Sequence, residues 1–235
     1  MANILFVQCY KIHQMPKKKY HKDAFERADD ERKNLILEVG IEEFSSKGYE
    51  NANINVIAKK AGISIGLMYK YFATKEDLFI TCLKHGTDIL EKALYDIMIS
   101  DDKLLIKAEK LIRTICAHSK KHSNYIKMYN EISSQKDSAE RIRAIVEEIE
   151  SKRSSIYITS IGQAFESGDV RSDLNPRLFA LFLDSLLTSL QFAYTCDYYR
   201  DKFRIYTGVD VNETDDEQII TQLLKFIESA FTFSK

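Results

Sequence analysis

The sequence predicts an all-α protein, with a small N-terminal three-helix domain followed by a larger helical domain. Three observations support this fold class. The 235 residues include only 2 Pro and 8 Gly, so few positions interrupt helices. From Asp29 onward the apolar residues recur at helical spacing. The pattern contains no strand–helix alternation and no internal repeat, which argues against a parallel sheet or a solenoid.

The first helices are delimited by capping residues and glycines. Asp29 and Asp30 can cap a helix to about Lys47, which Gly48 would end. Two short helices should follow over residues 54–61 and 65–72, each preceded by a good N-cap residue and separated by a glycine. Further helices are expected over residues 75–99, 102–121, 124–134, 137–168, 176–199 and 214–233. The capping residues that support these helices are Asn53, Ser64, Thr74, Asp101, Asp102, Asp137, Asn175 and Thr214. Thr214 and Glu217 have the spacing of a capping box, and Thr74 with Asp77 comes close to one.

The composition excludes several classes of protein. With 45% hydrophobic and 29% charged residues, the chain is neither largely disordered nor collagen-like. Its four cysteines are scattered and no His/Cys cluster has metal-ligand spacing, so we expect reduced thiols and no metal. No apolar run reaches the length of a membrane helix, which favours a cytoplasmic protein. Residues 1–28 are assigned as an N-terminal extension. The first 14 of them can precede a native start at Met15, and they receive no function.

Charge is distributed unevenly although the net charge is only −1. Between Asn51 and Lys75 the sequence has no acidic residue but four lysines. An acid-free basic window in a mildly acidic chain suits a phosphate-binding surface. Chance clustering of lysines explains the same window equally well at this point.

Two short helices joined by a glycine-containing turn, inside this basic window, suggest a helix-turn-helix. The segment reads Gly48-Tyr49, then Asn53-Ile54-x-x-Ile57-Ala58-x-x-Ala61-Gly62-Ile63-Ser64, and continues Gly66-x-Met68-Tyr69-x-Tyr71-Phe72-x-Thr74-Lys75-Glu76-x-Leu78. Over residues 30–90 it resembles the DNA-binding domain of the TetR family of bacterial transcriptional regulators. The resemblance implies a helix-turn-helix domain at 29–75, a connecting fourth helix at 75–99, and a helical ligand-binding and dimerisation domain within 76–235.

The resemblance and the exposed positions of the third helix indicate which residues contact DNA. Tyr69, Tyr71 and Lys75 take family positions that touch the phosphate backbone, while Phe72 is expected in the core. The apolar Ile65 departs from the family pattern and, with Leu67, could meet thymine methyl groups or pack inside the domain. The full set of expected DNA contacts is Asn53, Ser64, Ile65, Gly66, Leu67, Tyr69, Lys70, Tyr71 and Lys75.

The second domain is expected to form a dimer and to bind a small molecule. The helices at 176–199 and 214–233 are too apolar for one chain to cover, and the family implies a four-helix bundle with a second copy. The expected dimer residues are Phe179, Phe182, Leu183, Leu186, Leu190, Ile220, Leu223, Leu224, Ile227 and Phe231. Polar and aromatic residues could line a pocket for an amphipathic ligand, although each also fits an ordinary core. They are His118, Tyr125, Tyr129, Tyr157, Phe165 and Tyr194.

These features predict a homodimeric repressor that a small-molecule effector releases from a palindromic DNA operator. Two alternatives fit the same residues: a transcriptional activator, and a regulator controlled by a protein partner. An enzyme is disfavoured, because the sequence carries no nucleophile motif, no P-loop and no dinucleotide fingerprint. No cofactor is expected.

Overall fold

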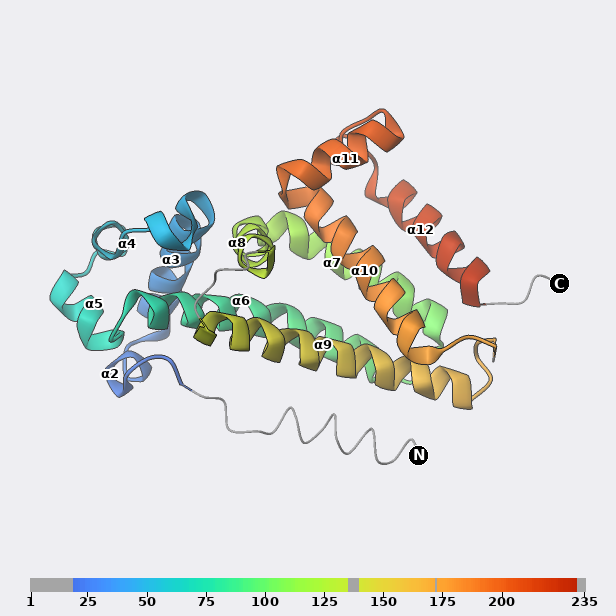
Figure 1. Cartoon of the computed structure of the whole chain (residues 1–235), viewed down its shortest axis with the longest axis horizontal. Coiled ribbons are helices and arrows are strands. Elements are labelled where there is room, and N and C mark those ends of the chain that lie inside the picture. Colours follow the sequence, from blue (N-terminus) through green and yellow to red (C-terminus); the bar gives the residue numbers. More distant parts are fainter. Residues whose placement is uncertain (1–18, 135–139, 172, 232–235) are drawn as a thin grey trace. The chain divides into compact units, whose positions relative to one another are not determined.

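A computed structural model of the chain describes residues 19–134, 140–171 and 173–231. Every regular element in these ranges is a helix, which confirms the all-α prediction (Figure 1). The helices, in order, are α2 Asp23–Glu26, α3 Asp30–Asn51, α4 Ile54–Lys60, α5 Ile65–Tyr71, α6 Lys75–Met98, α7 Leu104–Lys121, α8 Ser123–Ser134, α9 Glu140–Glu166, α10 Pro176–Thr195, α11 Asp197–Thr207 and α12 Asp216–Phe231.

The described residues divide into two compact units. The helix-turn-helix unit comprises residues 19–89, 124–134 and 140–147, and therefore holds α2 to α5 with α8. The C-terminal unit comprises residues 90–123, 148–171 and 173–231, and holds α7 and α10 to α12. Each of the long helices α6 and α9 has one end in the helix-turn-helix unit and the other end in the C-terminal unit. The domain limits suggested by the sequence, 29–75 and 76–235, remain a prediction.

The helix-turn-helix unit is built around aromatic side chains. Phe44 of α3 and Phe79 of α6 are almost fully buried, and their ring centroids lie 4.9 Å apart in an edge-to-face contact. Tyr49 contacts the same Phe79 ring at 4.9 Å. Such contacts stabilise a core beyond the burial of area alone. The α3 backbone leaves helical geometry at Gly48, where φ is 71°, so the predicted stop at this glycine is correct and one further turn follows it.

The C-terminal unit has its own apolar core, to which α6, α7, α9, α10 and α12 all contribute. Leu111 and Ile112 of α7, Ile161 of α9 and Leu187 of α10 are buried to 1% exposure or less. Asn175 caps α10 as predicted, since its side-chain oxygen accepts hydrogen bonds from the next two free backbone N–H groups. Pro176 occupies the first helical position.

Two local predictions in the C-terminal unit are wrong. The helix α7 begins at Leu104, and its first N–H donates to the distant Asp169 carboxylate at 2.7 Å rather than to Asp101 or Asp102. The predicted helix 176–199 ends at Thr195, because the backbone is extended at Cys196. The separate helix α11 follows. Asp137, the predicted start of α9, lies outside the described residues.

The start of the last helix also differs from the prediction. The carboxylate of Asp215 accepts the Glu217 N–H at 3.2 Å and caps α12. Thr214 instead donates its hydroxyl to the Asp210 carbonyl at 2.9 Å, so it does not form the expected capping box with Glu217. Aspartate and threonine are both good capping residues, and adjacent candidates shift the start of the helix by one residue.

By length and composition alone the helix α10 could cross a membrane, with a mean hydropathy of 1.3. The expectation that no segment reaches this length is therefore wrong, because a single Asp184 does not offset the surrounding leucines and phenylalanines. Half of the apolar window is buried within the protein. A core helix of a soluble protein has the same character, so length and composition alone are weak evidence for a membrane span.

Candidate nucleic-acid interface

The helices α4 and α5 form the two halves of a helix-turn-helix. Each begins with the predicted cap: Asn53 Oδ1 accepts the Asn55 N–H at 2.9 Å, and Ser64 Oγ accepts the Leu67 N–H at 3.1 Å. Gly62 turns the chain between the helices with a φ of +67°, a conformation that glycine adopts without steric cost. The Ile63 N–H then donates back to the Ala58 carbonyl. The turn is thus fixed by backbone hydrogen bonds on both sides.

The helix α5 presents one face to the core and the other to solvent. Met68 is buried, and Phe72, just after the helix, is buried as predicted. On the outer face Ser64, Ile65, Gly66, Tyr69 and Lys70 are exposed, with Leu67 half-buried. Ile65 is 38% and Tyr69 48% exposed, which is high for side chains of this size and leaves them available for contacts to a partner.

The burial of Tyr71 separates it from the other predicted DNA contacts. It is only 5% exposed, and its ring lies 5.5 Å from that of Phe25. An aromatic side chain in this position stabilises the end of α5 from the inside. The predicted DNA contact of Tyr71 is therefore replaced by a role in the core of the helix-turn-helix unit.

Lys75 opens α6 and is half-buried, with partners inside the protein. Its ammonium donates to the carbonyl oxygens of Glu50 (2.9 Å) and Ala52 (3.4 Å) and lies 4.9 Å from the centre of the Tyr49 ring. These carbonyls end α3, where a positive charge is favourable. The ammonium has three N–H donors, so one remains for a phosphate. The sequence predicted a phosphate contact for Lys75 and did not indicate these internal partners.

The N-terminal segment before α3 supports the end of the helix α5, which the sequence did not indicate. The backbone N–H of Lys22 donates to the Tyr71 carbonyl at 2.8 Å, and its ammonium donates to the Tyr69 carbonyl at 2.8 Å. Phe25 in α2 is 3% exposed and lies 4.7 Å from the Phe72 ring. The Phe25 side chain, apolar and close to the domain, was the available sequence signal for this packing.

The start of α9 is joined to the start of α6 by a double ion pair. The guanidinium of Arg141 contacts Glu76 Oε2 at 2.9 Å and Asp77 Oδ1 at 2.7 Å. The other oxygen of Asp77 accepts the Thr74 N–H at 3.1 Å, and the Thr74 hydroxyl accepts the Asp77 N–H at 3.1 Å. This reciprocal capping box was predicted from the sequence. Its connection to α9 was not, because no spacing rule relates residues so far apart in the chain.

The ten predicted dimer residues fall into two groups in the C-terminal unit. Five of them, Leu183, Leu190, Ile220, Ile227 and Phe231, are buried in the unit's own core. Phe179, Leu186, Leu223 and Leu224 are half-buried, and Phe182 is 58% exposed. Leu178, Leu181 and Phe226, which were not predicted as interface residues, are each more than half exposed.

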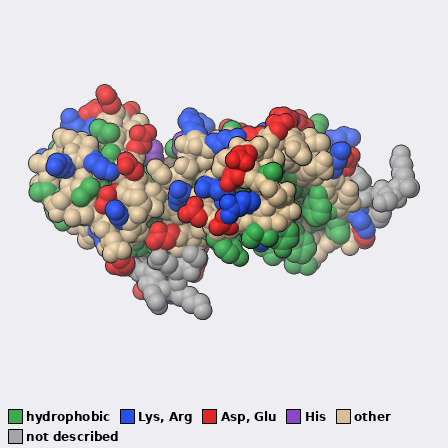
Figure 2. Space-filling view, turned by 90° about the horizontal axis from the view of Figure 1, so that it is seen from above, with side chains coloured by type: hydrophobic (Ala, Val, Ile, Leu, Met, Phe, Trp, Pro, Cys, Tyr) green, Lys and Arg blue, Asp and Glu red, His purple; other side chains and the backbone are tan. Residues whose placement is uncertain are grey.

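These exposed residues come from α10 and α12. Figure 2 shows hydrophobic side chains gathered over the unit that contains these two helices. Between them lies an apolar groove of about 380 Å³, lined by Phe179, Phe182, Leu186 and Phe226. Continuous apolar surface of this kind is unusual on a monomer.

The six predicted ligand residues do not lie in one unit. Tyr125 and Tyr129 belong to the helix-turn-helix unit, where the Tyr125 hydroxyl is hydrogen-bonded to Thr87 Oγ1 at 2.7 Å. Tyr157 is buried in the C-terminal core, against which Phe165 packs. His118 in α7 is 8% exposed, and neither ring nitrogen has a hydrogen-bond partner among the described residues. Burial lowers the pKa of His118 to about 4, so the ring is neutral at pH 7.

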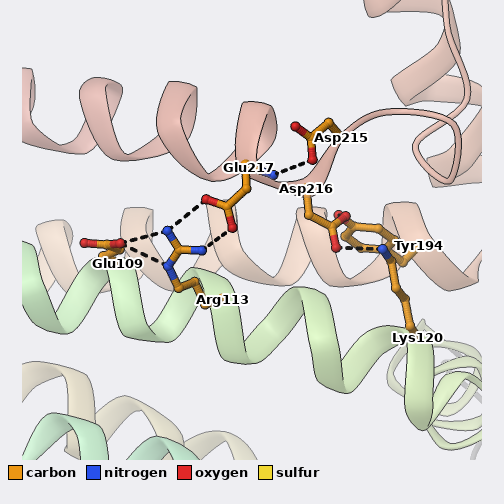
Figure 3. A network of polar contacts seen from close by, with 7 residues as sticks. All are labelled: Glu109, Arg113, Lys120, Tyr194, Asp215, Asp216 and Glu217. Carbon is orange, nitrogen blue, oxygen red and sulfur yellow. Dashed lines mark hydrogen bonds and ion pairs between the residues drawn. The ribbon is translucent and has the colours of Figure 1, made fainter.

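The hydroxyl of Tyr194, the sixth of these residues, takes part in a polar network (Figure 3). It donates to Asp216 Oδ1 at 2.7 Å, and Lys120 donates to Asp216 Oδ2 at 2.6 Å. Burial acts to raise the pKa of Asp216, but these two hydrogen bonds outweigh it and the pKa lies below its usual value. Arg113 bridges Glu109 and Glu217 nearby. The network ties α7 and α10 to the start of α12.

A capped helix-turn-helix with an exposed outer face is the geometry of a DNA-binding module, and a helical unit with an exposed apolar surface follows it. Residues 36–82 match the sequence model described as "Bacterial regulatory proteins, tetR family". The helix-turn-helix segment is that of the TetR family of transcriptional regulators.

Individual relatives agree with this assignment. The chain is 29% identical over 98 residues to the uncharacterized HTH-type transcriptional regulator YuxN of Bacillus subtilis, over 42% of this chain and 34% of YuxN. It thus spans about a third of the length of that relative. It is 24% identical over 152 residues to the HTH-type transcriptional repressor KstR2 of Mycobacterium tuberculosis, over 65% of this chain and 76% of KstR2.

A solved structure shows the same fold. The transcriptional regulator FadR from Bacillus subtilis, crystallised in complex with stearoyl-CoA, aligns with a TM-score of 0.65 at 18% identity. The alignment covers 84% of this chain and 98% of FadR. The helical architecture of both units is therefore that of a known regulator.

Proposed function

We propose that this protein is a cytoplasmic, homodimeric repressor that binds a palindromic DNA operator and is released from it by a small-molecule effector. The contacts to DNA come from Asn53, Ser64, Ile65, Gly66, Leu67, Tyr69, Lys70 and Lys75. The observation that carries the proposal is the outer face of α5. Its side chains are exposed, its first turn is capped by Ser64, and the surrounding window from 51 to 75 contains no acidic residue.

The direct test is fluorescence anisotropy of the full chain on labelled DNA from upstream of its own gene, with unrelated DNA as competitor and at two salt concentrations. We expect binding to the labelled DNA that persists in the presence of the unrelated competitor DNA, with a Kd of about 10⁻⁸ M or tighter. If the protein binds both DNAs with equal affinity and this binding is lost at the higher salt concentration, the DNA upstream of its gene does not contain an operator.

The variant Lys70→Ala tests the recognition face within the same assay. Lys70 is exposed on α5 and pairs with no other side chain among the described residues, so its replacement should leave folding unaffected. If it reads a base, binding to the operator weakens by about 1–3 kcal/mol and discrimination at one position relaxes. If it contacts a phosphate, affinity for all DNA falls and the salt slope decreases by about one. Lys92→Ala, an exposed lysine of the C-terminal unit, is the control. If Lys70→Ala, Lys92→Ala and the parent protein bind the operator with equal affinity, Lys70 does not contact the DNA.

A second copy of the chain is the proposed occupant of the exposed apolar face of α10 and α12. The exposed fractions of Leu178 (51%), Leu181 (56%), Phe182 (58%) and Phe226 (61%) support this, because covering these side chains removes a large apolar area from water. A twofold dimer would also present two copies of α5 to the two halves of a palindrome.

We expect the variant Phe182→Glu to separate the dimer while leaving each chain folded. Phe182 is largely exposed, so the substitution costs the isolated chain little, whereas it places a charge at the proposed interface. Sedimentation should move from twice the chain mass to 27.2 kDa. Ile106→Glu, at another exposed position (45%) in α7 of the same unit, should remain a dimer. A Phe182→Glu variant that stays dimeric contradicts this interface.

The effector site is proposed in the C-terminal unit beside His118, with Tyr157, Phe165 and Tyr194 as further candidates. The two unpartnered ring nitrogens of His118 support a polar ligand group there, since buried polar atoms are normally hydrogen-bonded. Tyr125 and Tyr129 remain candidates from the other unit. Because FadR was crystallised with stearoyl-CoA, that compound is the first probe. It should release the labelled operator, and free CoA should not. If stearoyl-CoA releases the His118→Ala variant from the operator as readily as it releases the parent protein, His118 is not part of the effector site.

A further inference from the structure

A polar cavity of about 490 Å³ lies within the C-terminal unit. Its walls are the connection from α6 to α7, the first turn of α7, and the last turns of α9 with the residues that follow them. Serine, aspartate, lysine and glutamine side chains make up most of the lining. The volume is that of a small-molecule site. Lys107 of the lining lies about 16 Å from His118 along the axis of α7, so this cavity is separate from the effector site proposed above.

Lys107 brings a buried positive charge to this cavity. The residue is only 6% exposed, whereas lysine is rarely buried unless it is paired. Its ammonium donates to the Met98 carbonyl at 2.8 Å and to Ser160 Oγ at 3.4 Å. An ammonium has three N–H donors, and the third has no acceptor among the described residues. A buried donor without an acceptor costs free energy, and an acceptor oxygen on a ligand in the cavity removes that cost.

Carboxylates line the same cavity and act on the same ammonium. Burial lowers the pKa of Lys107, and the charges of Asp102, Asp101 and Asp169 each act to raise it again. Asp102 is already paired with Lys110 at 2.5 Å. One oxygen of Asp169 accepts the first N–H of α7 at 2.7 Å. The other oxygen of Asp169 and both oxygens of Asp101 have no hydrogen-bond partner in the part of the chain that the structure describes. These oxygens can accept hydrogen bonds from a positively charged group.

We propose that this cavity binds a free α-amino acid, whose carboxylate accepts the third N–H of Lys107 and whose ammonium donates to Asp101 and Asp169. A ligand that is only an anion is repelled by the three carboxylates of the lining. A ligand that is only a cation is repelled by Lys107 and by Lys103, an exposed residue of the same lining. A zwitterion meets both signs of charge, and its hydrogen bonds to these side chains are of the strong, charge-assisted kind.

Equilibrium dialysis of the full chain against an equimolar mixture of all standard L-amino acids tests the proposal. No DNA is present, so the outcome does not depend on the proposed function. We expect at least one amino acid to be enriched on the protein side. That amino acid is then titrated alone by calorimetry, beside the amine that lacks its carboxylate and the acid that lacks its ammonium. Each of these analogues should bind at least about 10-fold more weakly than the amino acid.

Two variants assign this binding to the cavity. Lys107→Gln removes the buried charge but keeps an N–H donor for the Met98 carbonyl, and it should weaken binding by about 10- to 100-fold. Asp101→Asn changes an exposed residue, so the chain should fold normally and bind about 3- to 5-fold more weakly. The matched control is Glu213→Gln, which removes an exposed carboxylate of the same unit outside the cavity and should bind as the parent does.

Three results would overturn the proposal. The first is that no amino acid is enriched in the dialysis. The second is that either analogue binds as tightly as the amino acid itself. The third is that folded Lys107→Gln and Asp101→Asn proteins bind as well as Glu213→Gln does. Circular dichroism shows whether each variant is folded. If Lys107→Gln is not folded, Asp101→Asn decides, because its binding must still be weaker than that of the control.

Discussion

Replacing Gly86 by alanine should lower the free energy of unfolding of the helix-turn-helix unit by about 1–3 kcal/mol. A Cβ atom at this position of α6 would lie 2.0 Å from Cδ2 of Tyr125 and 2.5 Å from two further atoms of the same ring. Tyr125 is 7% exposed, and its hydroxyl is hydrogen-bonded to Thr87 at 2.7 Å. The ring therefore cannot move aside without losing this bond and disturbing buried neighbours.

Urea unfolding of Gly86→Ala checks this expectation, with Gly162→Ala as the control. Gly162 also lies inside a long helix, α9, but a Cβ there meets no atom within 4 Å. The control should gain about 0.5–1 kcal/mol, because alanine favours helix over glycine. Opposite signs for the two substitutions are expected. A stabilised Gly86→Ala protein would mean that α6 and α8 are not in close contact at this point.

Acidification should destabilise the protein through His118. Its folded pKa is about 4, lowered first by burial and further by the charge of His122, whereas a histidine in an unfolded chain has a pKa near 6.5. Between these values the unfolded chain binds the proton and the folded chain does not. The contribution of His118 is therefore complete above about pH 6.5 and is lost as the pH falls toward 4. The loss reaches about 3 kcal/mol over the full window.

The variant His118→Gln isolates this contribution from other titrating groups. Its stability at pH 7 can differ from the parent's because the side chain has a different shape. The decisive quantity is the change between pH 7 and pH 4.5, measured by urea unfolding of both proteins. The parent should lose more stability over this interval than His118→Gln does. Parallel curves for the two proteins would mean that His118 titrates normally and is open to solvent.

Local signals in the sequence were sufficient where one residue determines the backbone. Asn53, Ser64 and Asn175 cap helices as predicted, and the glycines at 48 and 62 adopt positive φ. The separate helix α11 was missed because its break at Cys196 involves neither glycine nor proline. The apolar pattern of α10 runs into the break without a change in composition, so no local signal ends the helix there.

The candidate sites were predictable only in part, for a different reason. The sequence pattern of α10 and α12 identified the apolar residues but did not indicate which of them face the core of their own unit. Five of the ten predicted interface residues face that core. The partners of Lys75 are backbone carbonyls, which have no sequence signature. The Lys22 and Arg141 contacts likewise join residues distant in the chain. Their positions follow from the packing of whole helices.

The double ion pair of Arg141 has a mechanical consequence for the start of α6. Arg141 lies in the first turn of α9, which begins at Glu140. A shift of this turn along the helix axis must either carry the first turn of α6 with it or break the contacts to Glu76 and Asp77. The Asp77 carboxylate also caps α6, which begins four residues after α5 ends. The first turns of α9 and α6 therefore move as one body for as long as both contacts of the guanidinium persist.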